Sequence, residues 1–121
     1  MPLAKIIFFK DEDGSVPILV WLKRLPPKVV DKCRVKLERL ALLGHELRRP
    51  ESDLLVKGIY ELRPSFQGIH YRILYFFHGS SVAVISHGIT KEGKIPDIEI
   101  AHALRRKALF EASPHQHTAV E

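Results

Sequence analysis

Runs of apolar residues, continuous or alternating with polar ones, predict four β-strands along this chain. The runs fall at about residues 4–9, 56–63, 68–77 and 82–89, and turn-forming or polar residues separate them. The segment 78–81, His-Gly-Ser-Ser, is short enough for a tight hairpin turn. The last two strands are therefore expected to pair as antiparallel neighbours.

The two-residue period of a strand predicts which side chains share a face of the sheet. In the third predicted strand, Tyr71 points to one face and Arg72 to the other. In the fourth predicted strand, strict alternation places Val84 and His87 on opposite faces. Arg72 is thus expected on a different face from the aromatic residue beside it.

Apolar residues at three- and four-residue spacing predict three helices. They cover about residues 15–22, 28–43 and 96–110, and each has a proline in or just before its first turn. The first two helices are expected to form an antiparallel hairpin that covers one face of the sheet. Trp21, in the first helix, is expected to anchor that helix in the core.

The third predicted helix carries Ile100, Ala101, Leu104 and Ala108 on its expected apolar stripe and Arg106 in its expected last turn. The Ser113-Pro114 pair marks an expected boundary after it. Residues 111–121 are therefore predicted to form a flexible C-terminal tail.

The order β-α-α-β-β-β-α predicts an α+β domain with a mainly antiparallel, twisted sheet. Residues 1–110 are expected to form this single domain, because 121 residues suffice for one hydrophobic core. Residues 45–55 are expected to form a polar connection without regular structure.

Composition narrows the class of protein and of partner. The formal net charge is +5, which favours nucleic acid or an acidic protein as partner, although a solvated basic surface has the same composition. The single cysteine, Cys33, excludes an internal disulfide. The chain shows no apolar leader at its start and no apolar run of membrane-spanning length, so a cytoplasmic location is expected.

Metal and cofactor chemistry find little support in the residue pattern. His115 and His117 could supply two ligands, but a closed metal site needs three or four. No glycine-rich phosphate loop or nucleophile elbow is present in the sequence. We therefore expect neither a metal nor another cofactor.

Basic residues gather on the last three predicted strands and on the loop after them: Arg63, Arg72, Lys91 and Lys94. Arg72 is the most informative, because a cation in the middle of an apolar strand needs a partner. One interpretation is a structural ion pair with Glu61 on the neighbouring strand. The other is a rigid guanidinium that binds a phosphate through two hydrogen bonds.

Aromatic residues near these cations have two interpretations as well. Tyr60, His70 and Tyr71 could stack on nucleic-acid bases. Tyr71 and Tyr75 could equally be core residues, and for Tyr75 the core is the favoured place.

The chain resembles toxins of the RelE/HigB type from type II toxin–antitoxin modules, in particular their phage-derived subgroup. The resemblance covers about residues 56–108, with the helical hairpin and first strand in matching order. The stretches that carry it are Gly-Ile-Tyr-Glu-Leu-Arg at 58–63, Tyr-Arg-Ile-Leu-Tyr-Phe-Phe at 71–77, His-Gly-Ile-Thr-Lys at 87–91, Lys-Ile-Pro at 94–96 and Glu-Ile-Ala-His-Ala-Leu-Arg at 99–105.

The resemblance implies a ribosome-dependent, metal-independent endoribonuclease. Such toxins cut mRNA in the decoding site, where the 2′-hydroxyl attacks the adjacent phosphate and leaves a 2′,3′-cyclic phosphate. Arg72 would bind the scissile phosphate, and Lys91 would offset charge on the leaving side. Glu61 and His87 are the two candidate bases.

The resemblance also implies contacts beyond the reacting phosphate. Arg63 and Lys94 would hold flanking phosphates, Lys57 would meet ribosomal RNA, and Tyr71 is the candidate for stacking. The implied partners are the ribosome, mRNA and an antitoxin, commonly a helix-turn-helix protein in this subgroup; no membrane partner is implied.

The chain departs from relatives at two points, and other functions stay open. Its last helix and tail lack the tyrosine that several relatives carry there, and Lys91-Glu92 replaces a frequent lysine pair. The alternatives are a ParE-like toxin that inhibits gyrase, or an RNA-binding relic without catalytic activity.

Overall fold

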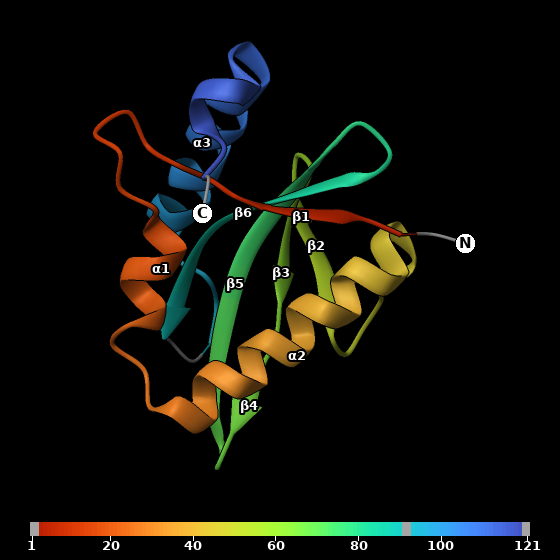
Figure 1. Cartoon of the computed structure of the whole chain (residues 1–121). Helices are drawn as coiled ribbons and strands as arrows, with labels where there is room; N and C mark the ends of the chain where they lie inside the picture. Colours follow the sequence, from red (N-terminus) through yellow and green to blue (C-terminus); the bar gives the residue numbers. More distant parts are fainter. Residues whose placement is uncertain (1–2, 91–92, 120–121) are drawn as a thin grey trace.

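The protein is described by a computed structural model over residues 3–90 and 93–119 (Figure 1). The strands and helices follow one another in an order close to the expected one. The strands are β1 Lys5–Phe8, β2 Ser52–Val56, β3 Ile59–Leu62, β4 Ser65–Phe66, β5 Ile69–His78 and β6 Val82–Thr90. The α-helices are α1 Pro17–Leu22, α2 Pro27–Leu43 and α3 Asp97–Ala112, and short 3₁₀ helices occupy Gly44–Glu46 and Pro114–His117.

The strands form one open sheet with the order β1-β6-β5-β3-β2, and β4 adds a short pairing to β5. β1 runs parallel to β6, while the β2–β3, β3–β5, β4–β5 and β5–β6 pairs are antiparallel. The prediction of an α+β fold with a mainly antiparallel sheet is therefore confirmed. So is the β5–β6 hairpin.

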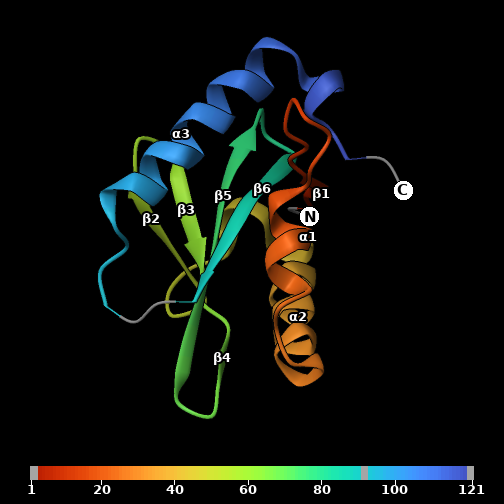
Figure 2. The same ribbon diagram turned by 90° about the vertical axis from the view of Figure 1, so that its left-hand side faces the viewer.

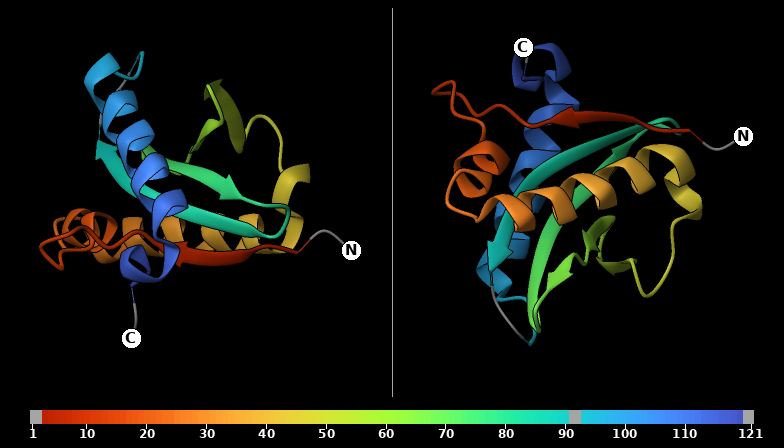
Figure 3. Two further views of the ribbon diagram at one scale, coloured as in Figure 1. Left: turned by 90° about the horizontal axis from the view of Figure 1, so that it is seen from above. Right: turned by 60° about the horizontal axis from the view of Figure 1, so that its bottom comes forward.

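Helices cover both faces of the sheet (Figures 2 and 3). α1 and α2 pack on one face, over a core that includes Ile18, Cys33 and Tyr75. α3 packs on the other face, over a core that includes Phe76 and Phe110. Leu74 and Phe76 face α3 while Tyr71 and Tyr75 face α2, so the predicted alternation along β5 is confirmed.

Two strands were not predicted. β2 lies inside the segment 45–55 and continues to Val56, and it pairs with β3 through a turn at Lys57-Gly58. Both turn residues have positive φ, 50° and 84°, as a tight type I′ hairpin turn requires. The sequence prediction placed this turn inside a strand, because Lys is uncommon at positive φ. The two-residue β4 is too short to show any period.

The faces predicted for β6 were wrong after Ile85. Tyr75 pairs with Ile85 but Leu74 pairs with His87, so Ser86 is an extra residue in a β-bulge. The bulge shifts the alternation by one residue. His87 therefore faces α3, on the same side as Val84, and Gly88 faces the ring of Trp21.

The apolar stripe predicted for α3 was right in part, since Ile100 and Leu104 pack against the core on that face of the sheet. Ala101 and Ala108 are exposed, whereas Ala103 and Phe110 are buried. The helix runs on to Ala112, so Arg106 lies in its interior rather than in its last turn. Alanine is compatible with either environment, so its spacing defined the buried face of this helix poorly.

The segment after α3 packs against the first strand, which the prediction of a flexible tail missed. His117 is buried, its ring stacks on Phe9 with centroids 5.0 Å apart, and its Nδ1 lies 2.8 Å from the Lys10 carbonyl oxygen. The amide of Ala119 donates to the Phe8 carbonyl at 3.0 Å. Histidine and alanine in a polar segment gave no apolar pattern from which these contacts could be predicted.

Candidate functional site

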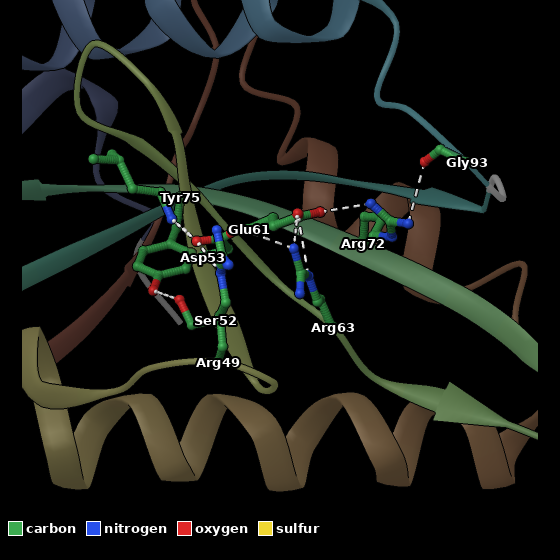
Figure 4. Close-up of polar contacts among 9 residues, drawn as sticks. Arg49, Ser52, Asp53, Glu61, Arg63, Arg72, Tyr75 and Gly93 are labelled. Carbon is green, nitrogen blue, oxygen red and sulfur yellow. Dashed lines mark hydrogen bonds and ion pairs between the residues drawn. The ribbon is translucent and has the colours of Figure 1, made fainter.

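Glu61 and Arg72 meet on the face of the sheet that α3 covers. Glu61 in β3 pairs with Leu74 in β5, so Arg72 lies two residues along the same face. Arg72 Nη1 donates to Glu61 Oε1 at 2.8 Å (Figure 4). The Glu61 side chain is 3% exposed and that of Arg72 is 17% exposed, so the arginine is the more accessible partner of this pair.

Arg63 approaches the same carboxylate from the end of β3. Its Nε and Nη2 lie 3.2 Å and 2.9 Å from Glu61 Oε2. Nη2 also donates to Asp53 Oδ2 at 3.1 Å, and Asp53 Oδ1 lies 3.0 Å from Arg49 Nε. The hydrogen bond from Arg49 is the main reason why the pKa of Asp53 is lowered. Charges thus alternate along one chain of contacts across β2, β3 and β5 (Figure 4).

The part of this contact chain from Asp53 to Arg72 lines a cleft of about 470 Å³ between the sheet and the start of α3. Arg72 Nη2 donates to the carbonyl oxygen of Gly93, in the loop that leads to α3, at 3.2 Å. Lys94, from the same loop, lines the cleft and is exposed. The charged lining residues are Asp53, Glu61, Arg63, Arg72, Lys94 and Asp97.

The structural ion pair proposed from sequence is present, and it is shared. Glu61 gives one oxygen to Arg72 and the other to Arg63. Burying a carboxylate costs free energy, which two guanidinium groups offset better than one. This arrangement fixes the orientation of both arginines, and it also neutralises part of their charge.

Arg63, Arg72, Lys94 and Glu61 are thus brought to one cleft, as expected from their places on neighbouring strands. Lys57 is exposed in the β2–β3 turn, next to Val56, which lines the cleft. Lys91 lies outside the described residues.

Two of the aromatic candidates, Tyr60 and Tyr71, lie on the other face of the sheet. Tyr71 is 5% exposed and meets Trp21 edge-on, with ring centroids 6.3 Å apart. Tyr60 stacks on Tyr75 at 5.4 Å. His70 is exposed, and it lines a second cleft of about 590 Å³ beside α2, together with Arg63. The cleft that holds Arg72 therefore receives neither Tyr60 nor Tyr71.

His87 belongs to a separate cluster between β6 and α3. Arg106 Nη1 lies 3.0 Å from His87 Nδ1, and His87 Nε2 lies 2.9 Å from Glu99 Oε1. Because a guanidinium can only donate, Nδ1 accepts its hydrogen bond and Nε2 carries the proton shared with Glu99. Burial, then the charge of Arg106, lower the pKa of His87 to about 4. His87 does not line the Arg72 cleft.

Sequence reasoning missed four residues of these clusters: Arg49, Asp53, Glu99 and Arg106. Asp53 became relevant only through the unpredicted strand β2. Arg106 is half-buried, and its Nε has no hydrogen-bond partner among the described residues. The bulge at Ser86 brings His87 to this arginine, and a strict two-residue period could not show that.

A family model for phage derived protein Gp49-like (DUF891) matches residues 20–108. The match covers most of the chain, and the chain belongs to this family. The family is phage-derived and related to the toxins of toxin–antitoxin systems, which suggests an antitoxin as partner. A comparison with curated proteins finds no match. Within the described ranges, no helix has both the length and the apolar character to cross a membrane.

Proposed function

We propose that this chain is the toxin of a type II toxin–antitoxin module, with a RelE/ParE-like fold and the activity of the RelE/HigB type. In this proposal it acts in the cytoplasm as a ribosome-dependent endoribonuclease that needs no metal. Two findings support it: the Gp49-like family is related to such toxins, and Arg63 and Arg72 converge on one cleft. The convergence of Arg63 and Arg72 is the observation that supports the proposed cleavage chemistry.

Cleavage in this proposal is a phosphoryl transfer within the RNA. The 2′-oxygen forms a bond to phosphorus while the bond to the 5′-oxygen breaks, which leaves a 2′,3′-cyclic phosphate and, once the leaving oxygen takes a proton from water, a 5′-hydroxyl. Negative charge builds on the non-bridging oxygens in the transition state. Fixed guanidinium groups lower its energy, and Arg72 is oriented for this by its bonds to Glu61 and Gly93.

The 2′-hydroxyl must also lose its proton. Of the two candidate bases, we favour Glu61, because it lies in the cleft with both arginines. His87 contributes nothing to the lining of that cleft, so it is not placed to reach the 2′-hydroxyl of an RNA bound there. In the substrate complex, the RNA phosphate takes over guanidinium contacts and so frees Glu61 to accept the proton.

The remaining basic residues have supporting roles in the proposal. Arg63 and Lys94 hold phosphates on either side of the scissile one, Lys91 offsets charge on the leaving oxygen, and Lys57 meets ribosomal RNA. A helix-turn-helix antitoxin would block this activity and repress the operon.

The competing function is inhibition of gyrase, which toxins of the same superfamily perform without such a cationic cluster. We favour cleavage of RNA because two arginines and a lysine share the cleft. Induced expression in bacteria, followed by primer extension on abundant mRNAs, tests this choice. New 5′-ends inside translated regions, present within minutes of induction and suppressed when translation initiation is blocked, are the expected result.

Two controls make that experiment decisive. Gyrase-linked DNA breaks are measured in the same cultures, and an uninduced culture gives the background of RNA ends. Growth arrest with DNA breaks and no new RNA ends would reverse the choice. Growth without any arrest, in cells that lack the antitoxin and contain folded protein, would favour the inactive relic.

A further inference from the structure

His87, Glu99 and His102 form a cluster outside the Arg72 cleft. Glu99 and His102 are three residues apart on α3 and therefore lie on one side of the helix. His87 reaches them from β6, with its Nε2 2.9 Å from Glu99 Oε1. His102 Nδ1 lies 3.8 Å from the same oxygen. One ligand atom from each residue lies within 4.8 Å of the other two.

The two separations that involve Glu99 are close to those of a first coordination sphere, and the two histidine nitrogens lie within 4.8 Å of each other. Metal–ligand bonds of about 2.0–2.1 Å at tetrahedral angles separate the ligand atoms by roughly 3.3 Å. The Glu99 oxygen is already near that distance from both histidines, so a small rotation of the half-exposed His102 side chain completes the set. We propose that His87, Glu99 and His102 bind a divalent transition metal ion, zinc being the representative case.

The donor set selects the class of metal. Two imidazole nitrogens and one carboxylate oxygen suit Zn²⁺, Co²⁺ or Ni²⁺, whereas Mg²⁺ and Ca²⁺ prefer oxygen ligands alone. His102 and Glu99 are 49% and 29% exposed, so an ion enters from solvent and water completes the coordination. Because the chain supplies three ligands to an ion that is usually four-coordinate, one coordination position remains for water.

The shell around His87 both supports and limits binding. Ser86 Oγ lies 2.7 Å from His87 Nδ1 and orients the ring so that Nε2 faces Glu99. On binding, the proton moves from Nε2 to Nδ1, which then donates to Ser86 Oγ, and Arg106 gives up its bond to that nitrogen. The nearby cation opposes a second positive charge. We therefore expect micromolar affinity rather than that of a closed zinc site.

A bound ion would join α3 to the bulge in β6. The cluster contributes no residue to the lining of the Arg72 cleft, so the proposed role is structural and does not depend on RNA cleavage. Because the folded chain assembles the three ligands and the unfolded chain does not, zinc should stabilise the fold by mass action.

Calorimetric titration of the untagged full-length chain with ZnCl₂ tests the site, together with thermal melting. One zinc ion per chain is expected, and a hundredfold excess over Kd should raise the Tm by roughly 5–10 °C. Co²⁺ should give the visible absorption of a nitrogen- and oxygen-ligated ion. His102→Ala should weaken zinc binding by more than about tenfold, since losing a ligand exceeds the loss of a supporting residue.

The matched control is His115→Ala, because His115 is an exposed histidine outside the cluster. It should leave the affinity and the Tm shift unchanged. Glu99→Gln should weaken binding without removing an imidazole. Two results overturn the proposal: no saturable zinc binding by the wild-type chain, or equal zinc affinity in the wild type and His102→Ala. Neither result bears on RNA cleavage, so this test and that of the proposed function fail separately.

Discussion

Arg72→Ala should lower the rate of the proposed ribosome-dependent mRNA cleavage by about 10²–10³-fold, the usual loss when one oriented donor to a transition state is removed. The reason is geometric: Arg72 is held by Glu61 and Gly93, and its side chain is partly exposed. The measurement is a single-turnover rate with purified toxin and ribosomes programmed with mRNA.

Arg72 also has a structural partner, so the variant needs controls that separate chemistry from folding. Arg72→Lys keeps a charge but loses the paired N–H groups, and it should recover only part of the rate. Arg34→Ala, which breaks an exposed pair with Glu38 on α2, should cleave at the wild-type rate. If Arg72→Ala retains the wild-type rate at a temperature where it is folded, Arg72 serves only to stabilise the sheet through its ion pair with Glu61.

Gly88→Ala should be among the most destabilising single substitutions in this chain. The indole of Trp21 lies against Gly88, where a Cβ atom would overlap the ring. Trp21 is held in place by its Nε1 hydrogen bond to Thr90 Oγ1 at 3.1 Å and by its edge contact with Tyr71. Overpacking of this kind costs about 1–3 kcal/mol or more, measurable by denaturant unfolding.

A double-mutant cycle shows whether the ring causes this loss. In a Trp21→Ala background, Gly88→Ala should cost much less, because the overlapping atoms are gone. Trp21→Ala alone is destabilising through lost packing, so the test is the interaction energy and not the stability of the double variant. An additive cycle would show that Trp21 does not limit the residue at position 88.

Regular periods made most of this fold predictable from sequence. The side chains of β5 alternate between the two faces of the sheet without interruption. The prediction that Arg72 lies on the face opposite Tyr71 is confirmed. That alternation, with Glu61 on the neighbouring strand, was enough to predict the Glu61–Arg72 contact. It also removes Tyr71 from the cleft, since the two side chains cannot share a face.

The errors lie where one residue departs from its usual conformation. Lys57 at positive φ creates the β2–β3 turn, and without β2 neither Asp53 nor its contact with Arg63 could be predicted. The extra residue Ser86 turns His87 towards Glu99 and Arg106. A sequence period cannot predict a bulge, because the bulge is fixed by pairing with the neighbouring strand.

The proposed function requires that the cleft position an RNA phosphate for attack by the adjacent 2′-hydroxyl. The most direct measurement uses ribosomes programmed with mRNA that carries a single 2′-deoxy nucleotide at a mapped cleavage position. The all-ribose mRNA should be cut there to give a 2′,3′-cyclic phosphate, and the substituted mRNA should remain intact at that position. Equal cleavage of both messages at that position would show that the 2′-hydroxyl is not the nucleophile.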